Sequence, residues 1–458
     1  MSEHQQPNPQ PGPQPHVPGQ FAPPQPAGWG APPQGWPQQS APIDPATEVD
    51  HAAAATAASG RSLAPDLARG LMLLLIALAN VPWWLWSDEK GMTNAHGLNA
   101  EGVDLAYQLF SLVAIDGRAY PLFAFLFGYG IWQMYSRQAA AGTPWRAARR
   151  VLQIRHGWMV AFGAVHALLL WYGDIVGAYG LVGLIITALL LRRSDRALTV
   201  VAWVFAGLVA LFGLFGLLSA LLLNTGIAGD ASDFAGAAMS VPTAAEQSNY
   251  LLFALQSIGT WLMVTPGQIF ALTVPLSVVL GIVAARRGLL DRPAEHRALL
   301  TRIAIGGIAI GWLGGALPAM QHAGLLFDPM LSWGTIGISS LAGVAGGIGY
   351  AALFGLIAAA IGGRRGIVTR AITAVGKRSL TSYLLQSVLF APLLAAWGFG
   401  LGAVLTPLGA AAIAVGVWLV TLVVALVLDL QGRRGPAEAL LRRLSYGKRP
   451  VAAPTPVV

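Results

Sequence analysis

Apolar runs long enough to cross a membrane dominate the chain, and short polar segments separate them. A helix of about 20 apolar residues spans the ~30 Å hydrocarbon core of a bilayer. The pattern predicts an all-α polytopic transmembrane bundle of about ten spans. The spans are predicted at roughly 68–86, 119–136, 156–172, 175–191, 197–223, 265–285, 303–319, 334–361, 379–398 and 407–428. Two further apolar stretches, 104–115 and 251–264, are predicted to be re-entrant or interfacial helices.

The lysines and arginines test this threading, because basic residues collect in the cytoplasmic loops of membrane proteins. With the N-terminus placed in the cytoplasm, 26 of the 28 Lys and Arg fall on the cytoplasmic side, and only Lys90 and Arg118 fall outside. A further crossing in the middle would disturb this alternation. Residues 251–285 are therefore predicted to cross once, and both termini are predicted to be cytoplasmic.

Composition agrees with a membrane protein, since 55% of the residues are hydrophobic and only 10% are charged. A soluble protein carries about 25% charged residues. The net charge is +8, but the basic residues lie in short loops, so we expect the lipid bilayer as a partner and no nucleic acid. The chain has no cysteine, which excludes disulfides and thiolate metal sites. We predict no metal site.

The two ends of the chain differ from the rest. Residues 1–60 hold 14 of the 30 prolines and no Lys or Arg, so they are predicted to form a disordered Pro/Gln/Gly-rich cytoplasmic tail. This stretch lacks the basic start and apolar core of a cleaved signal peptide. The membrane domain is predicted at 61–447 and a flexible C-terminal tail at 448–458.

The segment AVHALLLWYGDIVGAYG, residues 164–180, carries two ionisable side chains within an apolar setting. His166 is expected to be the one histidine well inside a span, and Asp174 to lie in an outer turn about 12 Å away at 1.5 Å per residue. A charge inside a span costs roughly 2.5–3.5 kcal/mol on insertion scales, so it needs a partner or a function. A neutral His166 can act as a general base with Asp174 orienting it. The alternatives are a histidine hydrogen-bonded across helices and an aspartate that caps a helix.

Polar side chains on the first span and after the second are candidates for binding a substrate. Asp66 and Arg69 lie one helical turn apart, where they can pair or where Arg69 can hold a phosphate. Asn80 lies eleven residues after Arg69 on the same face, and Arg137 follows the second span.

Two other polar groups lie at span ends. Asp116 and Arg118 precede the second span on the outer side. GKRSLTSYLLQS opens the ninth span with a polar stripe, in which all but Thr381 are expected to share one face; its candidate residues are Ser379, Thr381, Tyr383, Gln386 and Ser387.

Five blocks, in this order, resemble the YeiB-type bacterial membrane family, the domain of unknown function 418. They are PDLARGLMLLLIALAN, YPLFAFLFGYG, GAVHALLLWYGDI, GKRSLTSYLLQS and GPAEALLRRLSYG. The resemblance covers about residues 61 to 447, and Ala439 stands where that family often has Trp. No motif of soluble enzymes, such as a phosphate-binding Gly-Lys-Ser/Thr loop or an HExxH zinc motif, is present.

That family is similar to multispan acyltransferases, including the lysosomal glucosaminide acetyltransferase group, which pass an acyl group from cytoplasmic acyl-CoA to a sugar across the membrane. The resemblance implies an acyltransferase-like enzyme of the bacterial plasma (inner) membrane, with His166 and Asp174 as catalytic residues. It implies acyl-CoA as a co-substrate near Arg69 and Arg137, a sugar or lipid acceptor, and no bound cofactor. The related acyltransferases carry a key histidine near their first helices, whereas this chain has only His96, in the loop before the second span.

Two other classes of function stay open. The same polar groups would line the pathway of a transporter or permease of a small polar or lipid-linked molecule. They would also fit a structural membrane protein with satisfied polar packing, and a homodimer is an open assembly.

Overall fold

The structure, a computed structural model, describes residues 62–90, 94–225, 244–326, 329–362 and 366–446. Within these ranges the regular elements are helices, together with one isolated bridge between Lys90 and Gly97. The all-α prediction is therefore confirmed for the described part of the chain. The predicted tails, 1–60 and 448–458, lie outside the described residues.

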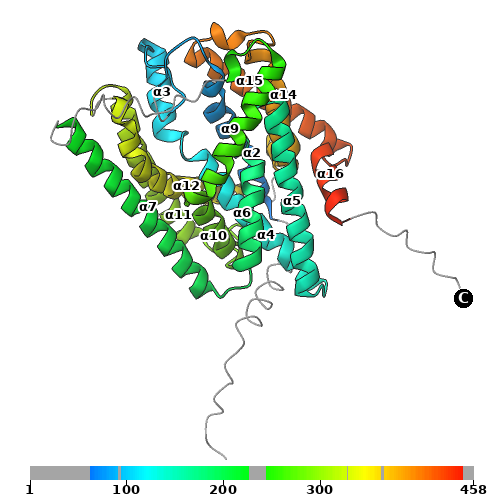
Figure 1. The fold of residues 1–458 in the computed structure, drawn as a ribbon. Coiled ribbons are helices and arrows are strands. Elements are labelled where there is room, and N and C mark those ends of the chain that lie inside the picture. Colours follow the sequence, from blue (N-terminus) through cyan, green and yellow to red (C-terminus); the bar gives the residue numbers. More distant parts are fainter. Residues whose placement is uncertain (1–61, 91–93, 226–243, 327–328, 363–365, 447–458) are drawn as a thin grey trace, which may run out of the picture. The chain divides into compact units, whose positions relative to one another are not determined.

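Long helices make up the N-terminal half, shown from blue to green in Figure 1. They are α2 (Leu63–Asn80), which continues into the 3-10 turn η1 (Val81–Trp84), then α3 (Gly102–Ala114), α4 (Ala119–Ala140), α5 (Trp145–Leu169), α6 (Val176–Leu189) and α7 (Asp195–Asn224).

The C-terminal half continues the bundle. Its helices are α9 (Tyr250–Phe270), α10 (Thr273–Arg286), α11 (Arg297–His322), α12 (Ile336–Ile361), α13 (Ile367–Lys377), α14 (Ser379–Leu394), α15 (Pro407–Leu430) and α16 (Pro436–Tyr446). The 3-10 turns are η2 (Ala244–Glu246), η3 (Pro329–Thr335) and η4 (Leu401–Ala403).

Six helical segments in the described residues are long and apolar enough to cross a membrane, which confirms a membrane protein. They are Leu63–Trp84, Gly102–Ala140, Asp195–Asn224, Arg297–His322, Leu331–Ile361 and Pro407–Leu430. The helices α6 and α14 are apolar but shorter. The helix α5 is less apolar because four arginines lie in its first half.

The segment 251–285 forms two helices rather than one. α9 and α10 meet at an angle of 55° and pass the test for a membrane span only as a pair. Pro266 lies inside α9, where it removes a backbone donor, and Leu272 at the break has a left-handed φ of 61°. The predicted re-entrant or interfacial stretch 251–264 is the first part of α9. The other such stretch, 104–115, is α3 and the residue after it.

Glycines allow the central helices to approach closely. Gly128 of α4 lies against the backbone of Val278, and Gly281 of α10 lies against the carbonyl of Phe125, so a methyl group at either glycine would overlap these atoms. The pair α4 and α10 therefore packs backbone against backbone, as small residues permit in membrane bundles.

Loops predicted to be cytoplasmic contact one another at one end of the bundle. The Ser62 hydroxyl donates to the carbonyl of Leu290 at 2.6 Å. The Arg286 guanidinium binds the Asp195 carboxylate at 2.7 Å.

Loops predicted to lie outside also meet. The backbone N–H of Trp86 donates to Gly402 at 3.1 Å. The Tyr250 hydroxyl donates to the carbonyl of Leu169 at 2.9 Å. Each of these four contacts joins parts of the chain that the threading predicts at the same side of the membrane.

Candidate functional site

The two predicted catalytic residues lie together in the interior. The Nδ1 atom of His166 and the Oδ1 atom of Asp174 are 3.2 Å apart, and the two side chains are 1% and 0% exposed. The predicted separation of about 12 Å is wrong. α5 ends at Leu169, and the chain then turns back along α5 and carries Asp174 inward to the level of Gly163.

The buried aspartate is held by two further donors. Its Oδ2 atom accepts from the backbone N–H of Gly177 at 2.6 Å and from the indole N–H of Trp261 at 3.4 Å. Gly177 lies in the first turn of α6, so Asp174 also serves this helix start as the capping alternative expected. A methyl group at Gly163 would overlap this carboxylate, which explains the glycine at that position of α5.

A third predicted residue reaches the same place from a distant part of the chain. Tyr383 of α14 has its ring centroid 5.4 Å from that of His166, and its hydroxyl accepts from the backbone N–H of Ile175 at 3.3 Å. Its side chain is buried. The structure therefore brings together His166, Asp174 and Tyr383, with Trp261 of α9 as a fourth member that sequence reasoning missed.

The rest of the polar stripe on α14 has other partners. Gln386 and Ser387 are buried with Tyr383, and the amide of Gln386 donates to the carbonyl of Leu73 at 3.0 Å. Ser379 is half-buried at the start of α14, and the Thr381 hydroxyl donates to the Glu438 carboxylate at 2.5 Å. The shared face is confirmed for Tyr383, Gln386 and Ser387.

The Nε2 nitrogen of His166 is available to accept a proton. Within the described residues neither ring nitrogen of His166 nor the Oδ1 atom of Asp174 has a hydrogen-bond partner, although all three atoms are buried. Leaving a buried polar atom unsatisfied costs about 1–3 kcal/mol. When a carboxylate faces one imidazole nitrogen, the proton sits on that side and the other nitrogen is a proton acceptor. The 3.2 Å distance between Nδ1 of His166 and Oδ1 of Asp174 brings the pair within reach of an oriented general base, which a hydrogen bond between the two atoms would complete.

A second histidine is buried in the same helix. His156 lies in the middle of α5, and its Nδ1 atom is 3.4 Å from the Thr187 hydroxyl. His156 lies inside this helix because α5 begins at Trp145 rather than near residue 156. That His166 alone lies well inside a membrane span stays a prediction.

A second histidine–aspartate pair lies at the other side of the bundle core, near the loops predicted to be outside. The Nε2 atom of His96 is 2.7 Å from the Asp116 carboxylate, whose side chain is 23% exposed. The ring of His322 lies 6.0 Å from that of His96 and is hydrogen-bonded to Gln108 at 2.8 Å. Only the tertiary structure brings these residues of the 94–97 loop, α3 and α11 together.

We expect His96→Ala to lower the detergent melting temperature, because it releases the 94–101 loop from the turn before α4. A hydrogen bond to a charged group contributes about 1.5–3 kcal/mol. Thermal unfolding of the purified protein measures the loss, with Glu101→Ala, a change at an exposed residue of the same loop, as the control. Equal melting temperatures for the two variants would show that the contact between His96 and Asp116 does not stabilise the fold.

The predicted binding residue Arg118 forms hydrogen bonds with backbone carbonyl groups. Its guanidinium donates to the carbonyls of Leu112, Asp116 and Gly311, and its side chain is buried. It thereby joins the turn between α3 and α4 to α11. A role in substrate binding stays a prediction.

The candidates on the first span and after the second have contacts other than the His166 cluster. Arg69 pairs with Asp66 at 3.3 Å and also donates to the carbonyl of Leu126 at 3.4 Å. Asn80 is half-buried at the opposite end of α2, and Arg137 is exposed in the last turn of α4. The ion-pair alternative for Asp66 and Arg69 is confirmed.

Sequence reasoning missed a half-buried carboxylate in the loop between α10 and α11. Asp291 accepts from the Tyr129 hydroxyl and from the Gln133 amide, each at 2.8 Å. Burial raises the pKa of the Asp291 carboxyl above its ordinary value, and the two hydrogen bonds oppose this change. The only sequence signal was the four-residue spacing of Tyr129 and Gln133, which places both on one face of α4.

Comparison with known proteins finds a family of unknown function and uncharacterized relatives. Residues 284–448 match the family model described as "Protein of unknown function (DUF418)". The uncharacterized protein YxaH of Bacillus subtilis (strain 168) is 26% identical over 414 residues, which is 86% of this chain and 96% of that protein. The uncharacterized protein YeiB of Escherichia coli (strain K12) is 33% identical over 131 residues, 27% of this chain and 30% of that protein. The matched family region contains Tyr383 but not His166 or Asp174.

Proposed function

The chain belongs to the YeiB-type DUF418 family of membrane proteins, and from that premise we propose that it is a membrane-embedded acyltransferase-like enzyme. It takes an acyl group from acyl-CoA on the cytoplasmic side and passes it to a hydroxyl or amine of a sugar, lipid or other acceptor on the opposite side. The observation that carries the proposal is the buried pair of His166 and Asp174 with a free imidazole nitrogen.

The proposed chemistry uses this pair as an oriented base. Asp174 keeps the proton of His166 on Nδ1, and Nε2 takes the proton of the acceptor hydroxyl, which makes the ring an imidazolium. The acceptor oxygen then attacks the thioester carbonyl, a C–O bond forms, and the C–S bond breaks. The leaving thiolate of CoA takes the proton from the imidazolium, whose charge Asp174 stabilises. Tyr383 accepts from Ile175 and keeps its own O–H to donate to the developing oxyanion.

The proposal requires the site to open, because both side chains are sealed. Trp261 of α9 covers Asp174, and α9 is separated from α10 by the break at Leu272. Movement of α9 at this break would uncover the carboxylate without disturbing α10, in the manner of lids that admit substrate.

A ten-span topology with both termini in the cytoplasm is part of the proposal. In the proposed topology the six apolar segments, the bent pair α9–α10 and the helices α5, α6 and α14 would make the ten crossings. The grouping of loop contacts and the 26-to-2 distribution of Lys and Arg support it. The membrane is proposed to be the bacterial inner membrane.

Single cysteines introduced into this cysteine-free chain test the topology. At the exposed positions Arg146 and Arg292, a membrane-impermeant thiol reagent should label opened vesicles only, whereas at Glu101 it should label intact cells. Labelling of Arg292→Cys in intact cells would contradict the ten-span arrangement, while a label at all three sites in opened vesicles confirms that each is accessible.

Release of CoA from acyl-CoA tests the activity. Purified protein in lipid nanodiscs is incubated with acyl-CoAs of two to sixteen carbons, with and without a sugar acceptor, and free thiol is measured. Acceptor-dependent release supports the proposal. The rival, proton-coupled transport, draws on the two buried histidines of α5, His156 and His166. It predicts no thiol release but uptake into proteoliposomes driven by a pH gradient.

A further inference from the structure

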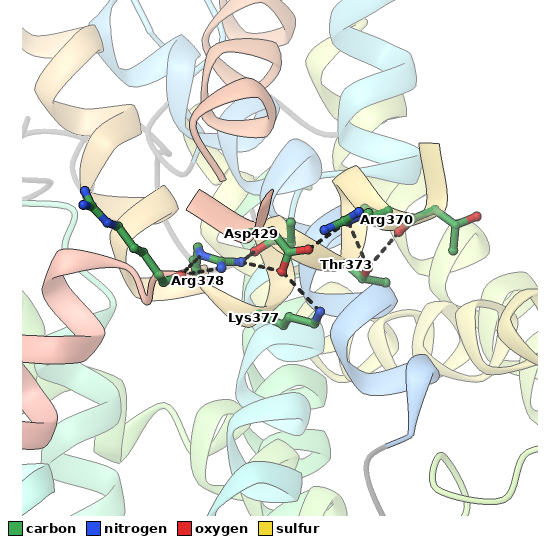
Figure 2. A network of polar contacts seen from close by, with 8 residues as sticks. Arg370, Thr373, Lys377, Arg378 and Asp429 are labelled. Atoms are coloured by element: carbon green, nitrogen blue, oxygen red, sulfur yellow. Dashed lines mark hydrogen bonds and ion pairs between the residues drawn. The ribbon is translucent and has the colours of Figure 1, made fainter. Parts of the chain in front are cut away.

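Arg155 of α5 is a partly buried cation without an ion pair. Its Nε atom is buried and has no hydrogen-bond partner, and its guanidinium forms no ion pair with a carboxylate of the described residues. Other cations that the threading places on the cytoplasmic side are paired: Figure 2 shows Arg370, Lys377 and Arg378 around the carboxylate of Asp429. Removing a guanidinium from water without an anionic partner is unfavourable, so Arg155 needs a reason.

The groups around Arg155 leave it short of negative charge. Three neighbouring side chains interact with it electrostatically, namely Glu438 and Tyr446 of α16 and Arg69 of α2. The Glu438 carboxylate accepts its hydrogen bonds from the first turn of α14. Arg69 brings a second guanidinium, which pairs with Asp66. Two arginines in this setting favour an added anion, and a phosphate suits the planar, multiple donors of a guanidinium.

Arg155 and His166 lie on the same side of α5. The eleven residues from one to the other make three helical turns and about 20°, and about 16 Å along the axis at 1.5 Å per residue. This side faces α14 and α16, since Tyr383 of α14 contacts the ring of His166 and α16 packs beside α5 (Figure 1). Met159 and Phe162 lie between the two polar residues on this side.

The length of this path distinguishes one acyl donor from another. In acyl-CoA about 14 bonds join the nearer phosphorus of the pyrophosphate to the thioester carbonyl, an extended length of about 16 Å at ~3.5 Å for every three bonds. In a phospholipid only about five bonds join the phosphorus to an ester carbonyl, or about 6 Å on the same scale. A phosphate bound at Arg155 therefore places the carbonyl of acyl-CoA, and not that of a phospholipid, at the level of His166.

We propose that Arg155, with Arg69 beside it, binds the pyrophosphate of acyl-CoA, so that the pantetheine arm runs along α5 and carries the thioester to Nε2 of His166. This binding mode rests on the proposed acyl transfer. Arg155 lies at the cytoplasmic boundary of the span predicted at 156–172, the side from which acyl-CoA comes in the proposed topology. The apolar side chains of Met159 and Phe162 would contact the methyl and methylene groups of the arm.

Equilibrium binding of desulfo-CoA tests the site without turnover, because this probe keeps the phosphates and the arm but has no sulfur to acylate. We measure it on the full-length protein in phosphatidylcholine nanodiscs, beside pantetheine, which has no phosphate. Arg155→Gln should weaken desulfo-CoA binding by about tenfold or more, since a hydrogen bond between charged groups is lost. Arg155→Lys keeps the charge and should retain more of the affinity. Arg150→Gln, at an exposed position of the same helix, is the control and should bind as wild type does.

Thiol release adds a kinetic test. Arg155→Gln should raise KM for acyl-CoA with kcat retained, and it should leave KM for acyl-pantetheine unchanged. Equal losses with both thioesters would give Arg155 a purely structural role and overturn the site. Thermal unfolding of each variant shows whether the fold is retained.

The binding outcomes separate the site from the reaction. Equal desulfo-CoA affinities for Arg155→Gln and Arg150→Gln, or no binding by wild type, would overturn the site. Inorganic pyrophosphate that binds as tightly as desulfo-CoA, with the same loss in Arg155→Gln, would assign the arginine to a free phosphate instead. Desulfo-CoA binding that depends on Arg155, without thiol release from any acyl-CoA, would support the site and contradict the proposed acyl transfer.

Discussion

Replacing His166 with alanine will abolish acyl transfer while the protein still inserts and folds. A general base contributes about 10²–10⁴-fold to a rate, and the Nε2 atom of His166 is the base in the proposed chemistry. His166→Gln will fail as well, because an amide forms hydrogen bonds but does not accept a proton at neutral pH. Thiol release from acyl-CoA by the purified variants, with thermal unfolding recorded beside it, measures both effects.

The second histidine–aspartate pair provides the matched comparison. His96→Gln changes a histidine that also faces a carboxylate, and it should retain most of the activity. Full activity in a stable His166→Ala variant, together with loss in His96→Gln, would move the catalytic role to the His96–Asp116 pair. A structural His166 gives the reverse pattern for the two substitutions, since alanine then destabilises the bundle and glutamine restores much of its stability.

Adding a single methyl group at Gly281 will strongly destabilise the bundle. In Gly281→Ala the new methyl would overlap the carbonyl oxygen of Phe125 on α4, so two backbones must separate. Overpacking of this kind costs about 1–3 kcal/mol. Gly207→Ala is the control, because Gly207 of α7 has open space around it and is exposed.

Thermal unfolding in detergent measures the two glycine variants under identical conditions. We expect a fall in melting temperature for Gly281→Ala and none for Gly207→Ala. A melting temperature for Gly281→Ala that matches wild type would mean that α4 and α10 separate at little cost, and the close packing would then not stabilise the fold.

Helices that are apolar along their whole length were predicted accurately. The span expected at 197–223 is α7, Asp195–Asn224, and the span expected at 407–428 is α15, Pro407–Leu430. Here the same residues determine both the helix and its place in lipid. In α5, helix formation and the predicted entry into lipid do not coincide. The predicted span begins at 156, but the helix begins at Trp145, because backbone hydrogen bonds continue through the arginine-rich first half.

The candidate site was likewise predicted only in part. The sequence marked His166, Asp174 and Tyr383 as polar residues in apolar surroundings, which need a reason because burying them is costly. It placed Asp174 at the surface, since hydropathy measures whether a segment enters the membrane but not the direction in which a turn leads. No pattern in the sequence marked Trp261 as part of this site, because it lies more than 80 residues from Asp174 along the chain.

By itself, the sequence determined that this protein is a helical membrane protein, which side chains of the ninth span share a polar face, and which family it resembles. These properties depend on local composition and spacing, and a bilayer admits few ways to satisfy the backbone other than helices. The tertiary structure alone decided which polar groups meet. The contact of His166 with Asp174, the approach of Tyr383 from a helix 208 residues after Ile175, and the three cations on Asp429 all depend on how helices pack, and packing follows from side-chain shape across distant segments.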